Sequence, residues 1–241
     1  MATPPADFAE QANPKTPAEA RRAGFRQATR VHGSFLVAAE KRALVWMAER
    51  SPDWVKPDHL TILGFAAQIG TGVCYELAAG DRRMLLAAIV CLAVNWFGDS
   101  MDGTLARVRQ QQRPRYGFYV DHMLDSIGAV ATMGGLALSG YMHPVIAIGL
   151  LIGFLLLAIQ SYLATYTMGE FHLSFWRCGP TELRILLAIG NLALFRWARV
   201  IHGHYRLFDI GGAIGLAGMG LTLILVITKN TLRLYREERI G

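Results

Sequence analysis

Six apolar segments, each about as long as a membrane-crossing helix, run through the chain between residues 61 and 228. A helix needs about 20 apolar residues to cross the hydrocarbon core of a bilayer. The segments lie at roughly 61–80, 84–107, 117–140, 145–168, 181–201 and 208–228. They predict an all-α, polytopic membrane protein with six transmembrane helices.

The composition agrees with a membrane protein and excludes several other classes. Of the 241 residues, 53% are apolar and 17% are charged, whereas soluble proteins are about 25% charged. Such a chain is neither disordered nor collagen-like. Its three cysteines, Cys74, Cys91 and Cys178, lie in apolar surroundings without metal-ligand spacing. They therefore predict packing residues rather than a disulfide framework.

The positive charge of the chain follows the predicted topology. A net charge of +6 would otherwise suggest a nucleic-acid partner. If the N-terminus is cytoplasmic, 19 of the 24 Lys and Arg residues lie on the cytoplasmic side, as the positive-inside rule requires. We therefore expect a multi-pass membrane protein with both termini in the cytoplasm, and no nucleic-acid partner.

The remaining chain divides into two tails and one amphipathic stretch. Residues 1–32 contain four prolines among small polar residues and predict a mobile tail rather than a signal peptide. Residues 33–56 predict an amphipathic helix in the membrane interface, and a helix packed on soluble protein is the alternative. Residues 57–232 form the predicted six-span membrane domain, and 233–241 form a cytoplasmic tail. The apolar stripe of the amphipathic helix consists of Leu36, Ala39, Ala43, Trp46 and Met47.

Four aspartates lie within or at the ends of the second and third apolar segments, where an unpaired carboxylate costs at least about 2.5 kcal/mol. One face of the second segment carries Asp99, Asp102, Gly103, Ala106 and Arg107, spaced i, i+3, i+4, i+7 and i+8. One face of the third carries Gly117, Asp121 and Asp125, spaced i, i+4 and i+8. The connection 108–116 is short enough for the two faces to oppose each other. The four carboxylates are therefore expected to converge in a cytoplasmic pocket.

Four like charges cannot share a low-dielectric site without countercharge. Oxygen ligands without His or Cys favour a hard divalent cation, Mg²⁺ or Mn²⁺. The small residues Gly103, Ala106 and Gly117 leave room for a ligand to approach the backbone, and Arg107 offers a planar donor fork suited to phosphate. The alternatives are a proton relay for the aspartates and ordinary helix packing for the glycines.

The run DSMDGTLARVRQQQRPRYGFYVDHMLD, from Asp99 to Asp125, resembles the signature of the CDP-alcohol phosphotransferase family. In that signature, D-x-x-D-G-x-x-A-R is followed by a spacer and by G-x-x-x-D-x-x-x-D. All eight signature residues are present. The spacer between Arg107 and Gly117 has nine residues, one more than the commonest form, which we interpret as loop variation.

The resemblance implies an integral-membrane enzyme of phospholipid synthesis that moves a substituted phosphate from a CDP-alcohol to an acceptor alcohol and releases CMP. It implies two divalent cations, Mg²⁺ or Mn²⁺, bound by Asp99, Asp102, Asp121 and Asp125. Asp125 is also the expected general base. The residues expected to line the CMP moiety are Gly103, Ala106, Arg107 and Gly117. The expected partners are the CDP-alcohol donor, the alcohol acceptor, membrane lipids and a second copy of the chain in a homodimer.

Four further positions carry weaker signals. Glu182 and Arg184 open the fifth segment on the side of the aspartates, after a Pro-Thr that family members often share, and either reach the site or only begin a helix. The stretch Pro57–Thr61 either lies near the nucleotide, as in the family, or caps a helix. His122 makes a D-H-x-x-D run that is more similar to choline and ethanolamine phosphotransferases, and a packing role explains it equally well.

The donor and acceptor stay open. We favour CDP-diacylglycerol as donor, and the alternative is a choline- or ethanolamine-type enzyme with a CDP-linked small head group and a lipid acceptor. Arg109, Arg113 and Arg115 either receive a phosphorylated acceptor or only set the topology.

Two other classes of membrane protein also use membrane-embedded aspartates, but both fit this sequence less well. Membrane prenyltransferases usually have more spans and two separated Asp motifs, and an ion or proton transporter should need polar groups across the full membrane depth.

Overall fold

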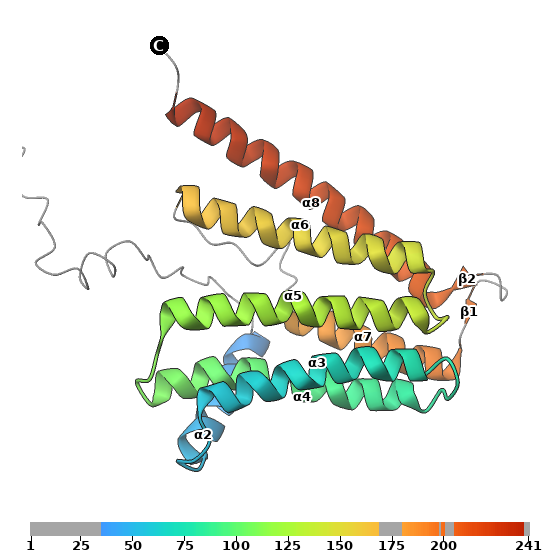
Figure 1. The fold of residues 1–241 in the computed structure, drawn as a ribbon, viewed down its shortest axis with the longest axis horizontal. Helices are drawn as coiled ribbons and strands as arrows, with labels where there is room; N and C mark the ends of the chain where they lie inside the picture. The colour runs from blue at the N-terminus through green and yellow to red at the C-terminus, as the bar shows by residue number, and fades with distance from the viewer. Residues whose placement is uncertain (1–34, 169–179, 198, 201–204, 239–241) are drawn as a thin grey trace, which may run out of the picture.

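The computed structural model describes residues 35–168, 180–197, 199–200 and 205–238, which form seven α-helices and one short β-hairpin (Figure 1). The helices are α2 (Phe35–Arg50), α3 (Pro57–Leu77), α4 (Met84–Val108), α5 (Pro114–Leu138), α6 (Pro144–Met168), α7 (Pro180–Arg196) and α8 (Leu207–Glu237). The helical fold predicted from the sequence is confirmed. The predicted tail 1–32 lies outside the described residues.

One short pair of strands lies between α7 and α8 in the otherwise helical fold. The apolar segment predicted to run to residue 201 ends as a helix at Arg196. Strands β1 (Arg199–Val200) and β2 (Tyr205–Arg206) then pair antiparallel. Helices α7 and α8, on either side of these strands, run in opposite directions, and the strand pairing satisfies backbone groups that a frayed helix end would leave open.

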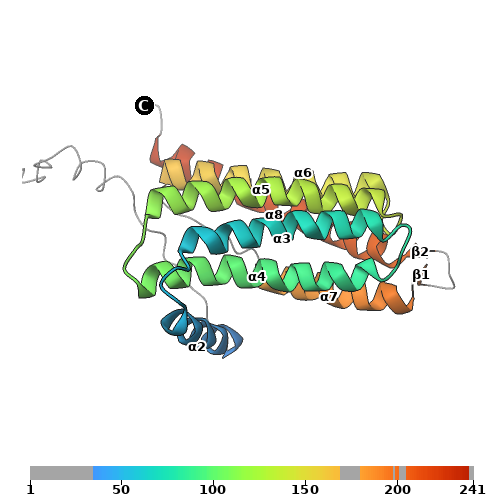
Figure 2. The same ribbon diagram turned by 60° about the horizontal axis from the view of Figure 1, so that its bottom comes forward.

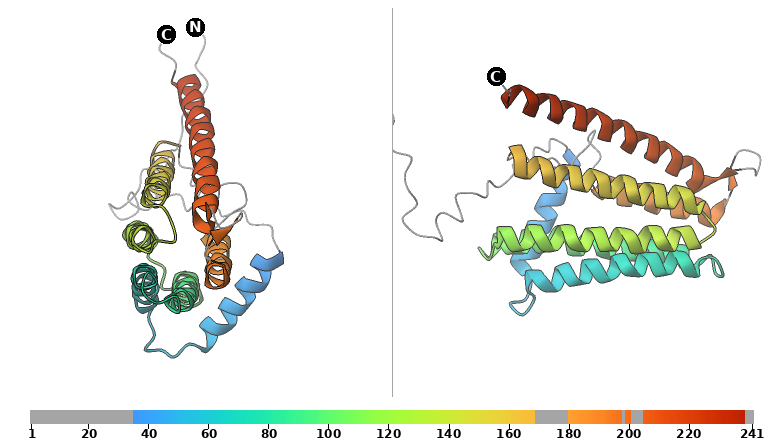
Figure 3. Two further views of the ribbon diagram at one scale, coloured as in Figure 1. Left: turned by 90° about the vertical axis from the view of Figure 1, so that its right-hand side faces the viewer. Right: turned by 45° about the horizontal axis from the view of Figure 1, so that its top comes forward.

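Four of the described helices, α3, α4, α6 and α8, are long and apolar enough to cross a membrane. Helix α5 carries charged residues within its length, and α7 has only 17 residues. Both nevertheless run alongside the other four (Figure 3). The chain is therefore an all-α integral membrane protein, and the count of six spans stays a prediction.

The outward face of α6 shows how the bundle meets the lipid. About half of the side-chain surface is exposed at Ile148, Ile152, Ile159 and Leu163, which share one helical face. An apolar face of this kind is unfavourable in water and suits contact with lipid. The exposed apolar side chains of α6 therefore agree with the lipid environment that the composition predicts.

The connection between α4 and α5 is short because α4 ends in a tight backbone motif. Gln110 has a φ of 56°, and the Gln111 amide donates to the Ala106 carbonyl at 2.8 Å. These two features define a Schellman motif. Pro114, with its restricted φ, then begins α5. The end of α4 and the start of α5 therefore lie at the same end of the bundle (Figure 1), as the predicted pocket requires.

Glycines allow α3 to contact both α4 and α5 through backbone atoms. A Cβ atom placed on Gly98 of α4 would lie 2.6 Å from the Gly64 nitrogen and 2.7 Å from the Leu60 oxygen of α3. A Cβ atom on Gly135 of α5 would overlap the carbonyl of Gly72. Small residues permit this close approach between membrane helices. Helix α3 therefore holds the two aspartate-bearing helices in a fixed relation.

Gly98→Ala is expected to lower the free energy of unfolding by about 1–3 kcal/mol, the usual effect of overpacking. The atoms that the new methyl group would meet belong to the backbone of α3, so no side-chain rotation can relieve the contact. Thermal melting in detergent measures the effect. Gly134→Ala is the matched control, because a Cβ atom there would meet nothing within 4 Å. Equal melting temperatures for the two variants would contradict the close α3–α4 contact.

Helix α2 lies across the end of the bundle at which α4 and α5 are connected (Figures 2 and 3). Its side chains Leu44 and Ala48 are buried and pack with residues of α3 and α4. The Glu40 carboxylate also accepts a hydrogen bond of 2.8 Å from the Trp96 indole of α4. Helix α2 is therefore held by both apolar and polar contacts.

The face by which α2 meets the protein differs from the predicted apolar stripe. Of that stripe, Ala43 and Trp46 are exposed, while the residues most buried are Leu44 and Ala48. The difference arises because α2 has two apolar faces, one against α3 and α4 and one turned outward. The side chains of Leu36 and Ala39 lie outside the described residues. Contact of the outward face with the membrane interface stays a prediction.

Helix α8 continues past the predicted end of the last span at residue 228 and ends at Glu237. It therefore includes part of the predicted tail 233–241. The Arg233 guanidinium and the Glu237 carboxylate form an ion pair of 2.9 Å at i, i+4 spacing. Such pairs stabilise an exposed helix by about 0.2–0.5 kcal/mol, which favours continuation of the helix here.

Candidate active site

All four signature aspartates line one cavity, which lies where α3, α4 and α5 meet. Asp99 and Asp102 come from α4, and Asp121 and Asp125 come from α5. The cavity is completed by Thr61, Gly64, Phe65, Gln68, Asn95 and Leu124. The predicted convergence of the four carboxylates is therefore what the structure shows.

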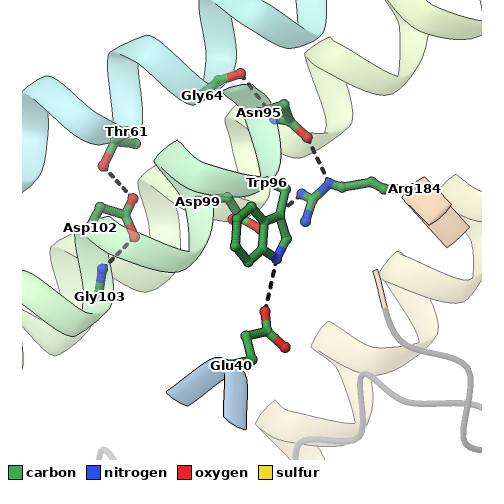
Figure 4. A network of polar contacts seen from close by, with 9 residues as sticks. All are labelled: Glu40, Thr61, Gly64, Asn95, Trp96, Asp99, Asp102, Gly103 and Arg184. Atoms are coloured by element: carbon green, nitrogen blue, oxygen red, sulfur yellow. Dashed lines mark hydrogen bonds and ion pairs between the residues drawn. The ribbon is translucent and has the colours of Figure 1, made fainter. Parts of the chain in front are cut away.

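Asp102 is the most deeply placed of the described carboxylates that line the cavity, with 9% of its surface exposed. Its Oδ2 atom accepts a hydrogen bond of 2.6 Å from the Thr61 hydroxyl of α3, and its Oδ1 atom accepts one from the Gly103 amide (Figure 4). Charge-assisted hydrogen bonds of this kind are stronger than neutral ones. Helix α3 therefore orients Asp102 directly, which gives Thr61 a role beyond the helix cap that its position suggested.

Asp99 is held from the other side, by α7. The Arg184 guanidinium donates through Nη2 to Asp99 Oδ2 at 2.8 Å and through Nε to Asn95 Oδ1 at 2.7 Å (Figure 4). Asn95 in turn donates to the Gly64 carbonyl at 2.9 Å. Of the two readings of Arg184 in the sequence, the one in which it reaches the site is confirmed. The side chain of Glu182 lies outside the described residues.

His122, next to Asp121 in the sequence, turns away from the cavity toward α6. Its Nδ1 atom lies 2.6 Å from the Phe118 carbonyl oxygen. Its ring lies 4.3 Å from the Phe118 ring and 5.2 Å from the Tyr162 ring, between ring centroids. These contacts favour the packing role for His122. They remove the support that its position gave to a choline- or ethanolamine-type enzyme.

The four residues predicted to line the CMP moiety are not among the residues that line the cavity. They are Gly103, Ala106, Arg107 and Gly117. The Arg107 guanidinium donates to the Thr104 hydroxyl at 3.0 Å and lies beside Gly103. A Cβ atom on Gly117 would meet nothing within 4 Å. Of these positions, Gly117 therefore borders open space, whereas the space beside Gly103 is occupied by the Arg107 guanidinium.

The donor set of the cavity fits a hard divalent cation in its chemistry, because its charged groups are carboxylates. Within the described residues, however, no three side chains of His, Cys, Asp or Glu are gathered as a finished ligand set. Asp99 and Asp102 instead direct an oxygen each to Arg184 and Thr61. Cation binding is therefore an inference from the donor types and not from a formed coordination shell.

Two arginines of the α4–α5 connection serve to position other elements. Arg109 donates to the carbonyl oxygens of Val55, Ser51 and Pro52 at 2.5, 2.7 and 2.9 Å. It thereby fixes the loop that joins α2 to α3. Of the roles considered for Arg109, capture of a phosphorylated acceptor is disfavoured by these contacts.

Arg113 forms an exposed ion pair with Asp58 in the first turn of α3. The hydrogen bond from Arg113 to Asp58 raises the pKa of this guanidinium. Since Arg is protonated at any physiological pH, the guanidinium stays charged, and the pair holds the start of α3 beside the start of α5.

The sequence did not identify Gln68 and Asn95 as residues of the cavity, and it did not predict that Thr61 holds Asp102. Two signals were available. Asn95 precedes Asp99 by one helical turn, and Thr61 and Gln68 share a face of α3 at i and i+7. A polar side chain within a membrane segment is by default a functional candidate.

The fold and the cavity define a class of protein: a helical membrane protein whose embedded carboxylates meet at one end of the bundle. The sequence model of the family described as CDP-alcohol phosphatidyltransferase matches residues 54–226. This chain belongs to that family. The matched region begins after α2 and ends within α8, so it contains every residue that lines the cavity.

Membership makes the chain a phosphotransferase of lipid synthesis. It acts on a CDP-alcohol and an alcohol within a membrane, and its family is generally dependent on divalent cations. The resemblance drawn from the eight signature residues is confirmed. No curated protein matches the chain in a sequence comparison.

Proposed function

We propose that this enzyme transfers a phosphatidyl group from CDP-diacylglycerol to an acceptor alcohol and releases CMP. The observation that carries the proposal is the cavity lined by Asp99, Asp102, Asp121 and Asp125. Four carboxylates at one end of a membrane bundle suit a diphosphate held by cations beside the lipid surface. A transporter, in contrast, should place its polar groups across the full depth of the membrane.

Each signature residue has a proposed role. The cation ligands are Asp99, Asp102, Asp121 and Asp125, for two ions of Mg²⁺ or Mn²⁺. When bound, such ions neutralise the charge of the diphosphate and orient it. The residues proposed to contact the CMP moiety are Gly103, Ala106, Arg107 and Gly117. The open space next to Gly117 and the position of the Arg107 guanidinium beside Gly103 support this role.

Asp125 is the proposed general base. It accepts the proton of the acceptor hydroxyl while the acceptor oxygen bonds to the phosphorus that carries diacylglycerol. The bond from that phosphorus to the bridging oxygen of the diphosphate breaks, and CMP leaves with the electron pair. Asp125 lies one helical turn beyond Asp121 on the cavity face of α5, so an acceptor can reach it beside the donor.

The cavity is proposed to open on the cytoplasmic side, where both termini also lie. The distribution of Lys and Arg supports this orientation. Helix α2, the α4–α5 connection and the C-terminal end of α8 lie at one end of the bundle (Figure 1), as a common cytoplasmic side requires. In keeping with the family resemblance, we also propose a homodimer, which light scattering in detergent would test.

The experiment that tests the proposal measures CMP release by the purified protein in lipid vesicles. CDP-diacylglycerol is offered with Mg²⁺ or Mn²⁺ and a panel of alcohols: glycerol phosphate, serine, inositol phosphate and a lipid alcohol. CMP release that depends on one alcohol is the expected result. A parallel arm offers CDP-choline or CDP-ethanolamine with diacylglycerol, and activity only in that arm would replace the proposed donor.

Arg107→Lys is expected to weaken CMP binding about tenfold, the loss of one hydrogen bond to a charged group. Lysine keeps the charge but loses the planar fork that can bind phosphate through two atoms. Titration with CMP measures the affinity, and Arg236→Lys at the end of α8 is the control. Unchanged affinity would assign Arg107 to the basic loop, where only its charge matters.

A further inference from the structure

Arg184 connects α7 to the cavity through two acceptors on α4. Its guanidinium reaches Asn95 Oδ1 at 2.7 Å and Asp99 Oδ2 at 2.8 Å, and only 14% of its side chain is exposed. The two acceptors lie one helical turn apart on the same face of α4. The planar fork of arginine can span this separation with fixed geometry, which a flexible lysine ammonium cannot.

Asn95 determines how this fork is oriented. The Asn95 side chain is buried, with 5% exposed, and both ends of its amide are bound. The amide nitrogen donates to the Gly64 carbonyl of α3 at 2.9 Å, so only the amide oxygen is available to Arg184. The backbone contact between Gly64 and Gly98 fixes α3 against α4 at this level. A series of hydrogen bonds therefore joins α3, α4 and α7, running from Gly64 through Asn95 and Arg184 to Asp99 (Figure 4).

Asp99 is the most exposed of the four carboxylates that line the cavity. Its side chain is 38% exposed, whereas Asp102 is buried and held by Thr61. An ionised carboxylate has two oxygens with about four acceptor positions. The bond from Arg184 uses one of these positions and restricts the rotation of the side chain, while the others remain for a further ligand.

We propose that Arg184 and Asn95 are positioning residues that hold Asp99 ready to bind a divalent cation. This inference rests on the proposed function, in which Asp99 is a cation ligand. Two other roles predict different results. If Arg184 acted only as a competing positive charge, its removal would strengthen cation binding, and if it only packed α7, its removal would change stability but not affinity.

The test measures Mn²⁺ binding to purified protein without substrate, by the loss of the free Mn²⁺ signal in electron paramagnetic resonance. Arg184→Ala is expected to weaken Mn²⁺ binding about 10–100-fold, the usual effect of removing a partner of a metal ligand. Arg184→Lys, which keeps the charge and the aliphatic stem, is expected to bind as weakly as Arg184→Ala. Arg196→Ala, at the other end of α7, is the matched control and keeps the affinity of the unchanged protein.

Asn95→Ala supplies a second and independent readout. If Asn95 acts through Arg184, the effects of Asn95→Ala and Arg184→Ala on Mn²⁺ affinity do not add in the double variant. Additive effects on Mn²⁺ affinity would overturn the proposal that Asn95 positions Asp99 through Arg184. Thermal melting without Mn²⁺ accompanies each variant, and Arg184→Lys serves where Arg184→Ala fails to fold.

The outcomes separate this inference from the proposed function. If the unchanged protein binds Mn²⁺ and releases CMP but the Arg184 variants bind Mn²⁺ equally well or more tightly, only the positioning role is overturned. If Arg184→Lys binds Mn²⁺ as tightly as the unchanged protein while Arg184→Ala binds it weakly, a positive charge is sufficient at this position. That result also overturns the positioning role of the arginine fork. If the unchanged protein binds no Mn²⁺, both the cation site and the positioning role are overturned.

Discussion

Asp121→Ala is expected to abolish CMP release. The cavity draws two carboxylates from α4 and two from α5, and this substitution leaves α5 with Asp125 alone. Loss of a residue that only supports a metal ligand already weakens binding about 10–100-fold, so loss of a direct ligand is expected to exceed that range. The measurement is CMP release under saturating donor, with Mn²⁺ binding determined on the same preparation.

The control for this experiment is Asp53→Ala, which removes an exposed carboxylate of the α2–α3 connection. It should leave both measurements unchanged. Dialysis of the unchanged protein against a chelator should also abolish CMP release, and Mg²⁺ or Mn²⁺ should restore it. Full activity in protein free of metal would overturn the cation assignment for all four aspartates.

The aspartate cavity could be predicted from the sequence because its geometry is local. Within one helix, spacings of three and four residues place side chains on one face, so the pair Asp99 and Asp102 and the pair Asp121 and Asp125 follow from spacing alone. The short connection between α4 and α5 then brings the two faces together. A sequence pattern of 27 residues therefore determines which four carboxylates meet.

The partners of those carboxylates could not be predicted in the same way, because they come from distant parts of the chain. Thr61 lies 41 residues from Asp102, and Arg184 lies 85 residues from Asp99. Which face of α3 or α7 meets α4 depends on helix packing. The packing of α3 against α4 includes the close contact of Gly64 with Gly98, and the sequence of a membrane segment does not reveal which residue a glycine contacts.

The orientation of α2 was beyond sequence reasoning for a related reason. Its apolar residues cover more than one face, so periodicity alone favours no single one. In the structure, the buried face of α2 is the one with Leu44 and Ala48. The Trp96 indole donates to Glu40, and Arg109 donates to the Ser51 carbonyl just after α2, so both contacts hold this face against α4. These polar contacts with α4 and with the connection after it therefore favour one rotation of α2 about its own axis, which the pattern of apolar residues did not determine.

Asp125→Asn is expected to lower turnover by about 10²–10⁴, the usual contribution of general-base catalysis. Asparagine keeps the shape of the side chain and one acceptor oxygen but cannot take up a proton at neutral pH. Donor binding should persist, because Asp99, Asp102 and Asp121 still line the cavity. The measurement compares kcat for CMP release with the affinity for the donor, and only kcat should fall.

Comparison with Asp121→Asn separates the two roles proposed for α5. Both variants carry the same chemical change one helical turn apart on the cavity face. Asp121→Asn should weaken Mn²⁺ and donor binding, whereas Asp125→Asn should keep donor binding and at least one bound Mn²⁺ ion and lose turnover. If Asp125→Asn also loses donor binding, Asp125 is chiefly a cation ligand. Normal turnover in Asp125→Asn would place the base elsewhere, and Glu182 would be the next residue to substitute, since His122 packs against Tyr162 of α6.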